Sequence, residues 1–512
     1  MSSGRLTVLI ASAFFMELLD GTIIATALPQ MARSFHVTAV AMNIGMTAYL
    51  LTVAVFIPVS GWVADRAGAR TVFASALGAF TVASLLCGLS HTLLEFTLMR
   101  VLQGMAGAMM VPVGRLILLR ATPPERLTEA ILWTQWPGLT ALVIGPPLGG
   151  LIATYASWHF IFFLNIPIGI VATVLALRWV RNERSEERHP FDWPTFLLAS
   201  VASTGLVWAL EMGAGGEFGR RALGVLTLSA ISGALAIAAA RRRPLTSLID
   251  LASMRKPTYA QAVYGASAFR VAVSVLPFLL PLMFQLAFGL SAFRSGLYLL
   301  ALFAGDMSMK ALVVPVLRRW GFRRVMLVNG VMTAGSLALC ATLGPATPVA
   351  LLLVILCVHG AMRSLEFTCM GTLAFTEIPS SGMSRANGFL SAVMQLGMGM
   401  GVPVGAMSVR LMGRFDQHAS GSPTLRDFHG AILFAAVLAL GPVFNSLKLA
   451  PDAGARTSGH RGDGIVAALE EVRISEAGIS EVEISDAEEA PVAFAAGHEA
   501  GEGAKLGVVR GA

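Results

Sequence analysis

Runs of about twenty apolar residues, separated by short loops, recur from the first ten residues to about residue 450. An α-helix needs about this length to cross the hydrocarbon core of a bilayer. The alternating pattern typical of a membrane barrel is absent from the sequence. With 55% hydrophobic residues, 13% charged residues and a mean hydropathy of +0.71, the chain has more apolar surface than a water-soluble fold hides. The sequence therefore predicts an all-α protein that crosses the membrane many times.

The apolar runs predict fourteen transmembrane helices of about 20–25 residues each. Residues 451–512 differ, being rich in Gly, Ala, Ser and Glu, with 12 acidic and 5 basic residues, and they predict a disordered acidic tail in the cytoplasm. The predicted spans are 7–29, 43–64, 71–90, 94–119, 128–153, 158–180, 195–213, 222–240, 258–287, 292–316, 324–344, 348–375, 384–410 and 428–449.

Arginine and lysine are unevenly distributed among the loops. The loops after the even-numbered spans hold most of them, including Arg66, Arg120 and the segments 178–188 and 241–256, whereas the alternate loops hold few or none. Since basic loops stay in the cytoplasm, both termini are predicted to be cytoplasmic. The formal charge of +7 is therefore attributed to membrane topology and not to nucleic-acid binding.

An internal repeat indicates two related halves. DRAGART at 65–71 follows the second span and RRWGFRR at 318–324 follows the tenth, with Gly68 aligned to Gly321. Eight spans separate the copies, whereas a parallel repeat of six helices would separate them by six, so two extra helices are expected between the halves. The predicted domains are six-helix bundles at 1–190 and 246–450, two linker helices at 191–245 and the tail at 451–512.

The first span carries two acidic residues, Glu17 and Asp20, near its middle. A carboxylate at that depth costs roughly 2.5–3.5 kcal/mol on insertion scales, so it normally faces the bundle interior or a water-filled cavity. The spacing of three puts both acids on one helix face. Two interpretations are open: each acid pairs with a buried cation elsewhere in the bundle, or the acids form a proton-titratable site.

Four stretches carry motifs that point to one family. They are G-x-x-x-D-R-x-G-x-R at 61–70, R-x-x-Q-G at 100–104, G-P-x-x-G-G at 145–150, and LDGTIIATALP at 19–29 taken with WHFIFFLNIPIG at 158–169. Together they resemble the major facilitator superfamily, specifically its fourteen-span drug:proton antiporters of the bacterial multidrug-resistance type. The resemblance covers residues 7–450 and implies the major-facilitator fold, with two six-helix bundles plus two inserted central helices.

The 61–70 loop is interpreted as a cytoplasmic latch. Gly61 and Gly68 allow a tight, closely packed turn. Asp65 is expected to accept hydrogen bonds from backbone amides at a helix N-terminus of the opposite half, and Arg66 and Arg70 to pair with nearby acids. These contacts would hold the outward-open state. The alternative is that the arginines only anchor the loop on the cytoplasmic side.

Arg100 and Gln103 lie three residues apart within the apolar fourth span, and a guanidinium buried there needs an acceptor. The first and fourth helices are neighbours in the resembling family's fold, so Asp20 is the expected acceptor. A nearby guanidinium lowers the proton affinity of a carboxylate and desolvation raises it, so entry of water or substrate changes which effect dominates. We therefore assign proton coupling to Asp20, Arg100 and Gln103, together with Glu17.

The fifth span contains Gly145, Pro146, Pro147, Gly149 and Gly150. The prolines remove amide donors and the glycines permit close helix contact, so this segment is expected to bend and to pack tightly against the second half. In the resembling family this motif is associated with antiporters and so favours export. The alternative is a kink that has no bearing on direction.

Weaker candidates for a substrate cavity are Arg270, Asn165, Met109 and Met394. Arg270 has no sequence-local partner, and the methionines supply the flexible thioethers that suit a promiscuous pocket. Asn165 is expected to help bend the sixth span, together with Pro167. The remaining intramembrane charges are expected to form two salt bridges within single helices, Asp306 with Lys310 and Arg363 with Glu366.

The resemblance implies a proton-coupled secondary transporter that exports small organic compounds or drugs, amphipathic or cationic, by alternating access. The sequence contains no nucleotide-binding signature, metal-spaced His/Cys set or nucleophile elbow, so we expect no enzyme activity, no cofactor and no metal site. The expected partners are a small-molecule substrate, protons and the lipid bilayer, but no nucleic acid.

We expect a monomer in the bacterial inner membrane and leave open whether accessory efflux components work with it. Two alternatives to drug export also remain open. One is a dedicated metabolite exporter or an uncoupled facilitator of the same fold. The other is a membrane sensor or scaffold that acts through the tail at 451–512.

Overall fold

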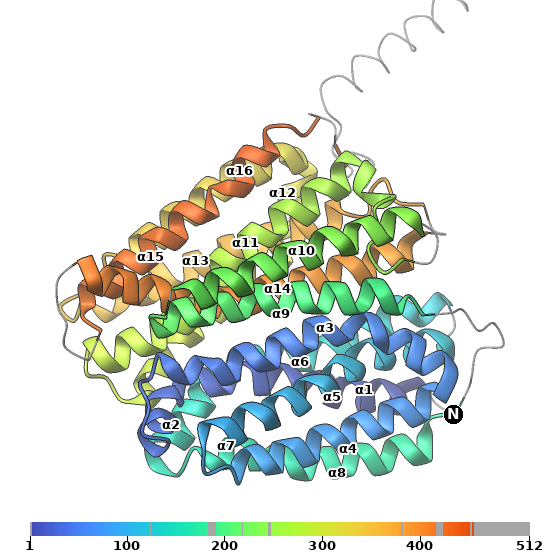
Figure 1. Cartoon of the computed structure of the whole chain (residues 1–512), viewed down its shortest axis with the longest axis horizontal. Helices are drawn as coiled ribbons and strands as arrows, with labels where there is room; N and C mark the ends of the chain where they lie inside the picture. The colour runs from blue at the N-terminus through green and yellow to red at the C-terminus, as the bar shows by residue number, and fades with distance from the viewer. Residues whose placement is uncertain are drawn as a thin grey trace, which may run out of the picture. The chain divides into compact units, whose positions relative to one another are not determined.

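The protein is described here from a computed structural model that covers residues 3–122, 124–182, 191–217, 219–243, 247–379, 382–415, 423–450 and 453–454. Every regular element in these ranges is a helix, and they contain no strand (Figure 1). Within the described residues, thirteen helical segments are long and apolar enough to cross a membrane. The prediction of an all-α membrane protein is confirmed. The predicted tail at 451–512 lies outside the described residues except for 453–454, and its disorder stays a prediction.

The helices fall into three sets along the chain. The N-terminal half contains α1 (Ser3–Ile23), α2 (Leu28–Ser34), α3 (Ile44–Ala67), α4 (Ala69–Gly88), α5 (Leu93–Ala121), α6 (Pro124–Tyr155), α7 (His159–Phe163) and α8 (Asn165–Trp179). The inserted pair consists of α9 (Trp193–Gly215) and α10 (Arg220–Arg242). The C-terminal half contains α11 (Pro257–Leu282), α12 (Ala292–Cys340), α13 (Val349–Leu373), α14 (Met383–Phe415), α15 (Leu425–Ala439) and α16 (Gly441–Ser446).

The helix α12 is 49 residues long but consists of two helices joined at Gly321. Gly321 has φ 70° and ψ 164°, a backbone conformation that favours glycine. Dividing α12 there turns the thirteen segments into the fourteen that the sequence predicts. Gly68, its partner in the internal repeat, has φ 92° and ψ 137° between α3 and α4. The two repeat copies therefore make the same type of turn between consecutive helices.

Two of the predicted spans are interrupted. The first was expected to run to Pro29, but α1 ends at Ile23 and a 3-10 turn precedes α2, where Pro29 lies in the first turn. Proline suits that position because backbone amides in the first turn of a helix have no hydrogen-bond acceptor within the helix, so the missing N–H of proline costs nothing there. The sixth span is divided between α7 and α8 at Leu164, next to Asn165, where a bend was expected.

Local sequence also fixes where the site-bearing helix α5 begins. The Thr92 hydroxyl accepts a hydrogen bond from the Glu95 amide at 3.2 Å, and the Glu95 carboxylate accepts from the Thr92 amide at 3.3 Å. This reciprocal capping box satisfies two amides that the helix leaves unpaired. It sets the register in which α5 presents Arg100 and Gln103 to the interior.

The hydrophobic cores show how the two halves pack together. One core combines residues of both halves, including Ile23 and Met42 with Phe284 and Leu299. A second core uses only residues 6–180, and two more use only residues after 253. The common core lies where α1 ends and α12 begins, at the end of the bundle that carries α2 and α7, which we call the shared end (Figure 1). At the opposite end, where the chain starts, each half has its own core, and we call this the split end.

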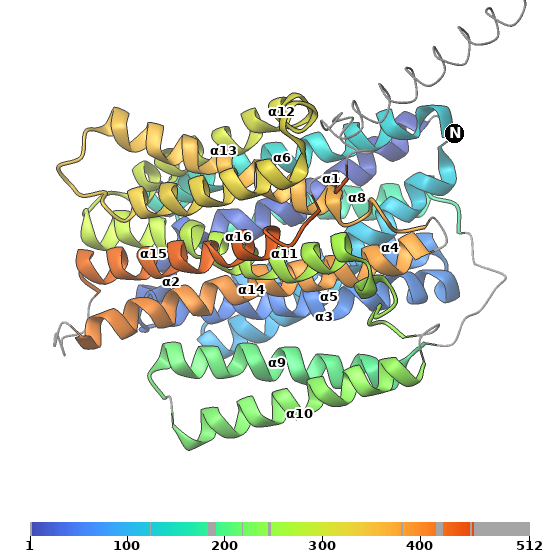
Figure 2. The same cartoon turned by 90° about the horizontal axis from the view of Figure 1, so that it is seen from above.

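The inserted helices α9 and α10 pack against each other through small polar residues. The hydroxyls of Ser229 and Ser232 donate to the backbone carbonyls of Ala202 and Leu198 at 2.5 and 2.8 Å. The helix α9 also contacts α3 of one half and α14 of the other. The pair runs along one side of the bundle in Figure 2 and bridges the two halves. The predicted domain boundaries at 190 and 245 lie outside the described residues.

Candidate functional site

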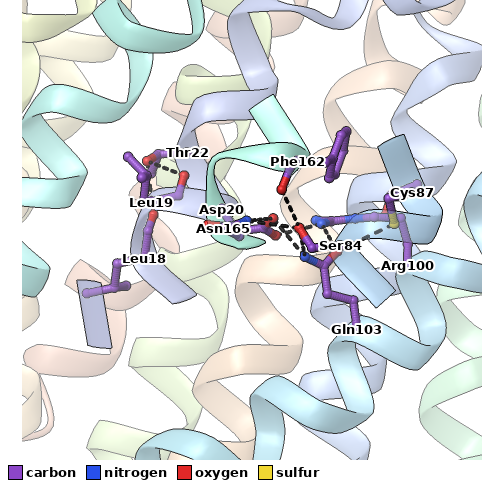
Figure 3. Close-up of polar contacts among 11 residues, drawn as sticks. Leu18, Leu19, Asp20, Thr22, Ser84, Cys87, Arg100, Gln103, Phe162 and Asn165 are labelled. Carbon is purple, nitrogen blue, oxygen red and sulfur yellow. Dashed lines mark hydrogen bonds and ion pairs between the residues drawn. The ribbon is translucent and has the colours of Figure 1, made fainter. Parts of the chain in front are cut away.

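The candidate site is a buried polar cluster in the N-terminal half, defined by Asp20, Ser84, Arg100, Gln103 and Asn165 and called the Asp20 network (Figure 3). The helix α1 contributes Asp20, α4 contributes Ser84, α5 contributes Arg100 and Gln103, and α8 contributes Asn165. Each of the five side chains is at most 1% exposed. Side chains from four helices thus meet in one hydrogen-bonded cluster, in which α5 and α8 supply the direct donors to Asp20.

Asp20 accepts from three side chains. Arg100 Nη1 lies 2.6 Å from Asp20 Oδ2 and forms an ion pair with it. Gln103 Nε2 donates to Oδ1 at 2.8 Å, and Asn165 Nδ2 donates to the same oxygen at 3.2 Å. Both carboxylate oxygens of Asp20 therefore have side-chain donors, one of them charged. The contacts that the sequence predicted from Asp20 to Arg100 are present in the structure.

The donors around Asp20 are themselves held in place. Arg100 Nη1 also donates to Gln103 Oε1 at 2.6 Å, and Arg100 Nε donates to the Gly45 carbonyl at 3.3 Å. The guanidinium lies 4.2 Å from the centre of the Tyr49 ring, a distance at which a cation–π interaction contributes. These contacts fix the plane of the guanidinium, so Arg100 presents its charge to Asp20 in one orientation.

Sequence reasoning missed Ser84 and did not assign Asn165 to this network. Ser84 accepts from Asn165 at 3.1 Å and donates to the Phe162 carbonyl at 3.0 Å. Asn165 was assigned as a weak cavity candidate, but its amide lies within the network. The available signal was a small polar residue in the middle of an apolar helix at Ser84, together with an amide beside the break between α7 and α8.

Glu17 lies outside the hydrogen-bond network, although the sequence put it on the same face as Asp20. Its side chain is partly exposed, and its Oε2 atom is buried without a hydrogen-bond partner among the described residues. Arg115 and Asp20 are the charged groups that act on it electrostatically. Because Glu17 precedes Asp20 by almost one turn of α1, it lies on the side of the network nearer the split end.

The latch loop makes contacts within its own half and with the inserted pair. A Cβ atom on Gly68 would collide with the side chain of Asn182, which follows α8. The guanidinium of Arg66 lies 4.7 Å from the centre of the Trp62 ring, and Trp62 packs edge-on against Trp193 of α9.

Other residues of the latch loop are less closely packed. Asp65 and Arg70 are partly buried. The close packing predicted at Gly61 is wrong, because a Cβ atom there would meet nothing within 4 Å. That glycine lies inside the helix α3 on an exposed position, where an extra methyl group has open space.

The glycine and proline run of the fifth span lies within α6 and faces two partners. A Cβ atom on Gly149 would collide with the carbonyl oxygen of Ile23 in α1, and one on Gly150 with the carbonyl oxygen of Ala292 in the C-terminal half. Gly145 packs in the same way against Thr22. The predicted tight packing against the second half is therefore present.

The two prolines do not interrupt α6, which runs as one helix from Pro124 to Tyr155. A carbonyl of the run has found a partner outside the helix, because the Pro146 carbonyl accepts from the Thr26 hydroxyl at 3.2 Å. The carbonyls that lose their intrahelical donors to the two prolines are those of Leu142 and Val143, one turn earlier, so the contact from Thr26 is additional to the bonds within α6. The run thus acts as a place where α1, α6 and α12 approach closely.

The C-terminal half holds a second polar cluster, and its pairing corrects a prediction. Arg363 Nη2 pairs with Asp306 Oδ2 at 3.1 Å, whereas Glu366 accepts from Asn329 Nδ2 at 2.8 Å. Neither predicted local salt bridge forms, and Lys310 is exposed. The partners lie on α12 and α13, so the pairs form between two helices. The sequence had suggested pairs within one helix because it shows only the spacing along each helix.

The other weak cavity candidates have ordinary environments, with one exception. Met109 and Met394 are partly buried and pack against the separate cores of the two halves. Arg270 differs, because its nearest polar contact is the thioether sulfur of Met398, 3.2 Å from Nη1. It also lies over the ring of Phe367 at 4.4 Å.

Comparisons with known proteins agree with this architecture. The family model described as Major Facilitator Superfamily matches residues 10–402 and 268–452. A protein of Salmonella paratyphi A named "Putative multidrug resistance protein MdtD" is 37% identical over 432 residues, which cover 82% of this chain and 89% of the relative. The protein of the same name from Citrobacter koseri is 39% identical over 414 residues, covering 80% and 86%.

Solved structures share the fold at low sequence identity. A D-xylose-proton symporter matches with a TM-score of 0.60 at 13% identity, covering 85% of this chain and 97% of the symporter. A bacterial homolog to the human lysosomal transporter Spinster, in an inward-facing and occupied conformation, matches with a TM-score of 0.62 at 14% identity, covering 87% and 96%. The likeness extends over most of each chain, so it applies to the arrangement of both halves.

Proposed function

This chain belongs to the Major Facilitator Superfamily and is a multi-pass membrane transporter, not an enzyme, and on that basis we propose that it exports small organic compounds in exchange for protons. The Asp20 network is the observation that carries the proposal. A carboxylate held by three donors inside a helix bundle is a group whose protonation must alter its contacts.

Alternating access requires two states of the bundle, and the cores indicate which one is described. The halves share a core at one end and have separate cores at the other. By the positive-inside rule we assign the split end to the cytoplasm, since Arg66, Arg70 and Arg323 lie there. The described conformation is then an inward-facing state in a bacterial inner membrane, with both termini cytoplasmic.

In this state Asp20 is ion-paired and shielded from water, so the proton is expected to reach it in the opposite state, from the periplasm. Arg100 competes with that proton for the carboxylate. When the halves return to the described state, the guanidinium of Arg100 again forms an ion pair with the Asp20 carboxylate, and the proton leaves Asp20. Glu17, which is partly exposed and nearer the split end, is the acceptor that would pass it to the cytoplasm.

Two other elements would serve the movement between states. The close contacts of Gly149 with Ile23 and of Gly150 with Ala292 provide a pivot between α1, α6 and α12. The turn at Gly68 between α3 and α4, with Asp65, Arg66 and Arg70 on the flanking helix ends, lies at the split end and is suited to close it in the opposite state. The antiport direction follows from the proton gradient, which is inward across a bacterial inner membrane, so substrate leaves as protons enter.

The proposal is tested in everted membrane vesicles, whose cytoplasmic face is outside. Uptake of a panel of cationic, neutral and anionic fluorescent compounds is measured with and without a pH gradient. Wild type should accumulate at least one compound only with the gradient, and Asp20→Asn should lose this dependence. Glu217→Gln, which changes an exposed acid at the end of α9, is the matched control. If Asp20→Asn exports and releases protons as wild type does, the assignment fails. Transport that is indifferent to the gradient would identify an uncoupled facilitator instead.

A further inference from the structure

Arg270 is an arginine inside the membrane without an acid partner. It lies midway along α11, and among the described residues it forms no ion pair. Its Nε atom is buried and has no hydrogen-bond partner within the described chain, while Nη1 contacts only the sulfur of Met398. A thioether is a weak acceptor for a charged donor. A buried guanidinium with donors left over is costly, and membrane proteins normally provide such a residue with an anion or a water-filled route.

Among the described residues, the charged group that acts on Arg270 electrostatically is a second arginine, Arg363. Asp306 occupies Arg363 Nη2, but Arg363 Nε is also buried and without a partner among the described residues. Two guanidinium groups, each with an unused Nε donor, thus lie near each other on α11 and α13. The two guanidinium groups repel each other, and among the described residues the carboxylate of Asp306 is the one that offsets this repulsion.

Aromatic side chains flank this arginine pair. The ring of Phe367 lies 4.4 Å from the Arg270 guanidinium carbon and 5.9 Å from that of Arg363. Phe303 lies 5.4 Å from the Arg363 guanidinium and Phe269 packs edge-on against Phe367. The side chains of Phe367 and Met398 are partly exposed. An anion that bound the two arginines would therefore contact an aromatic and thioether surface at the same time.

The position of Arg270 also links it to the movement of the halves. Its neighbour Phe269 belongs to the separate core of the C-terminal half, whereas Val271 packs against the shared core. On α14, a Cβ atom at Gly397 would lie 3.2 Å from Arg270 Cβ, and one at Gly399 would lie 3.3 Å from Leu50 of the N-terminal half. Arg270 therefore lies at the boundary between the shared core and the separate core of the C-terminal half.

From these contacts we infer that Arg270 and Arg363 bind the anionic head of a transported organic compound, a sulfonate, carboxylate or phosphate on an apolar or aromatic body, with Phe367 and Met398 against that body. The inference rests on the proposed function, because it names the substrate class of the same transporter. It replaces the sequence-based expectation of a cationic substrate, since two adjacent arginines repel a cation. Guanidinium groups bind oxyanions through paired, charge-assisted hydrogen bonds.

The test uses the full-length protein in lipid nanodiscs and three probes with one aromatic body: naphthalenesulfonate, naphthalenesulfonamide and naphthylmethyl-trimethylammonium. Their affinities are measured by isothermal titration calorimetry. Wild type should bind the sulfonate at least tenfold more tightly than the other two. Arg270→Gln should lose this preference, Arg270→Lys should keep part of it, and Lys310→Gln, which removes an exposed charge from α12, should leave it unchanged. If Arg270→Gln does not fold, the affinities of wild type and of Arg270→Lys for the three probes still test the anion site.

Equal binding of the three probes by wild type, or a full preference for the sulfonate in Arg270→Gln, would overturn the inference. Transport in everted vesicles separates it from the proposed function, because the permanent charges prevent the ionic probes from distributing passively with pH. If the pH gradient drives uptake of the ammonium probe but not of the sulfonate, the anion site is refuted and proton-coupled export still stands. A second outcome is that the sulfonate binds in an Arg270-dependent way while no probe responds to the pH gradient. That result would support the anion site and refute proton coupling.

Discussion

At the scale of single residues, Asp20 forms its ion pair with Arg100. Replacing a buried ion pair with apolar residues is often neutral, but removing one partner leaves an uncompensated charge and costs about 3–5 kcal/mol. Gln103 and Asn165 donate to Asp20 as neutral amides, so they satisfy its lone pairs without supplying charge. The two roles are separable by mutation.

We predict that Arg100→Gln lowers the free energy of unfolding by about 3–5 kcal/mol, because Asp20 then has no cation in the bundle core. The double variant Asp20→Asn/Arg100→Gln should recover a large part of this loss, since neither charge remains. The measurement is SDS-induced unfolding in mixed micelles, with Arg33→Gln, an exposed arginine of α2, as the control. A double variant as unstable as Arg100→Gln would contradict the ion-pair account.

Glu17 is predicted to behave differently from Asp20. Glu17→Gln should not lower the free energy of unfolding, since its Oε2 atom has no hydrogen-bond partner to lose within the described chain and a neutral amide costs less to bury than a carboxylate. Because Glu17 is the proposed exit for protons, the same variant should slow proton release in everted vesicles while substrate binding persists. Proton release at the wild-type rate would remove Glu17 from the pathway.

How far the sequence predicted these residues depended on whether the partner lay on the same helix. The spacing of Arg100 and Gln103 and the depth of Asp20 were visible in the sequence, and the family resemblance supplied the neighbouring helix. The link between Asp306 and Arg363 was not visible, because 57 residues separate them and only the packing of α12 on α13 brings them together. Short spacings suggested local salt bridges that the structure does not contain.

At the scale of helices, the contact between α1 and α6 depends on the absence of side chains. Gly149 lies so close to α1 that a Cβ atom would collide with a backbone carbonyl, which cannot rotate away as a side chain does. We predict that Gly149→Ala destabilises the protein by about 1–3 kcal/mol through overpacking and lowers the rate of transport. Unfolding in mixed micelles and vesicle uptake measure the two effects.

The matched control for this prediction lies on the partner helix. Gly21 of α1 has nothing within 4 Å of the position of its missing Cβ. Gly21→Ala should therefore be neutral or stabilise the helix by up to about 1 kcal/mol. If both variants lose the same stability, the close approach of α6 to α1 is not what Gly149 provides.

Helix number and approximate position were predictable because an apolar run of sufficient length leaves few alternatives in a membrane. The breaks inside the first and sixth spans were harder to predict. Pro29 and Pro167 mark both regions, yet proline occurs inside α6 without ending it. The presence of a proline alone therefore does not tell whether a helix ends there, because a proline inside a helix removes one hydrogen bond and the rest of the helix can continue.

At the scale of the whole molecule, the shared core at one end and the separate cores at the other are what the proposed inward-facing state requires. The sequence predicted two halves and an inserted pair, but not which end is closed, because residues at both ends are apolar and the choice depends on contacts between halves. The contact of Thr154 with Phe293 is one that the opposite state should break, since it joins the halves at the shared end.

We therefore predict that cysteines introduced together as Thr154→Cys and Phe293→Cys form a disulfide under mild oxidation and stop transport, because the cross-link holds the shared end closed. The Thr154 hydroxyl accepts from the Phe293 amide at 3.0 Å on the exposed surface, so oxidant reaches the pair, whereas Cys87, Cys340 and Cys369 are buried. Transport is measured in everted vesicles before oxidation, after oxidation and after reduction, with each single cysteine variant as the control. Full transport by the cross-linked protein would show that this end does not open during the cycle, and the assignment of the described conformation to an alternating state would then be wrong.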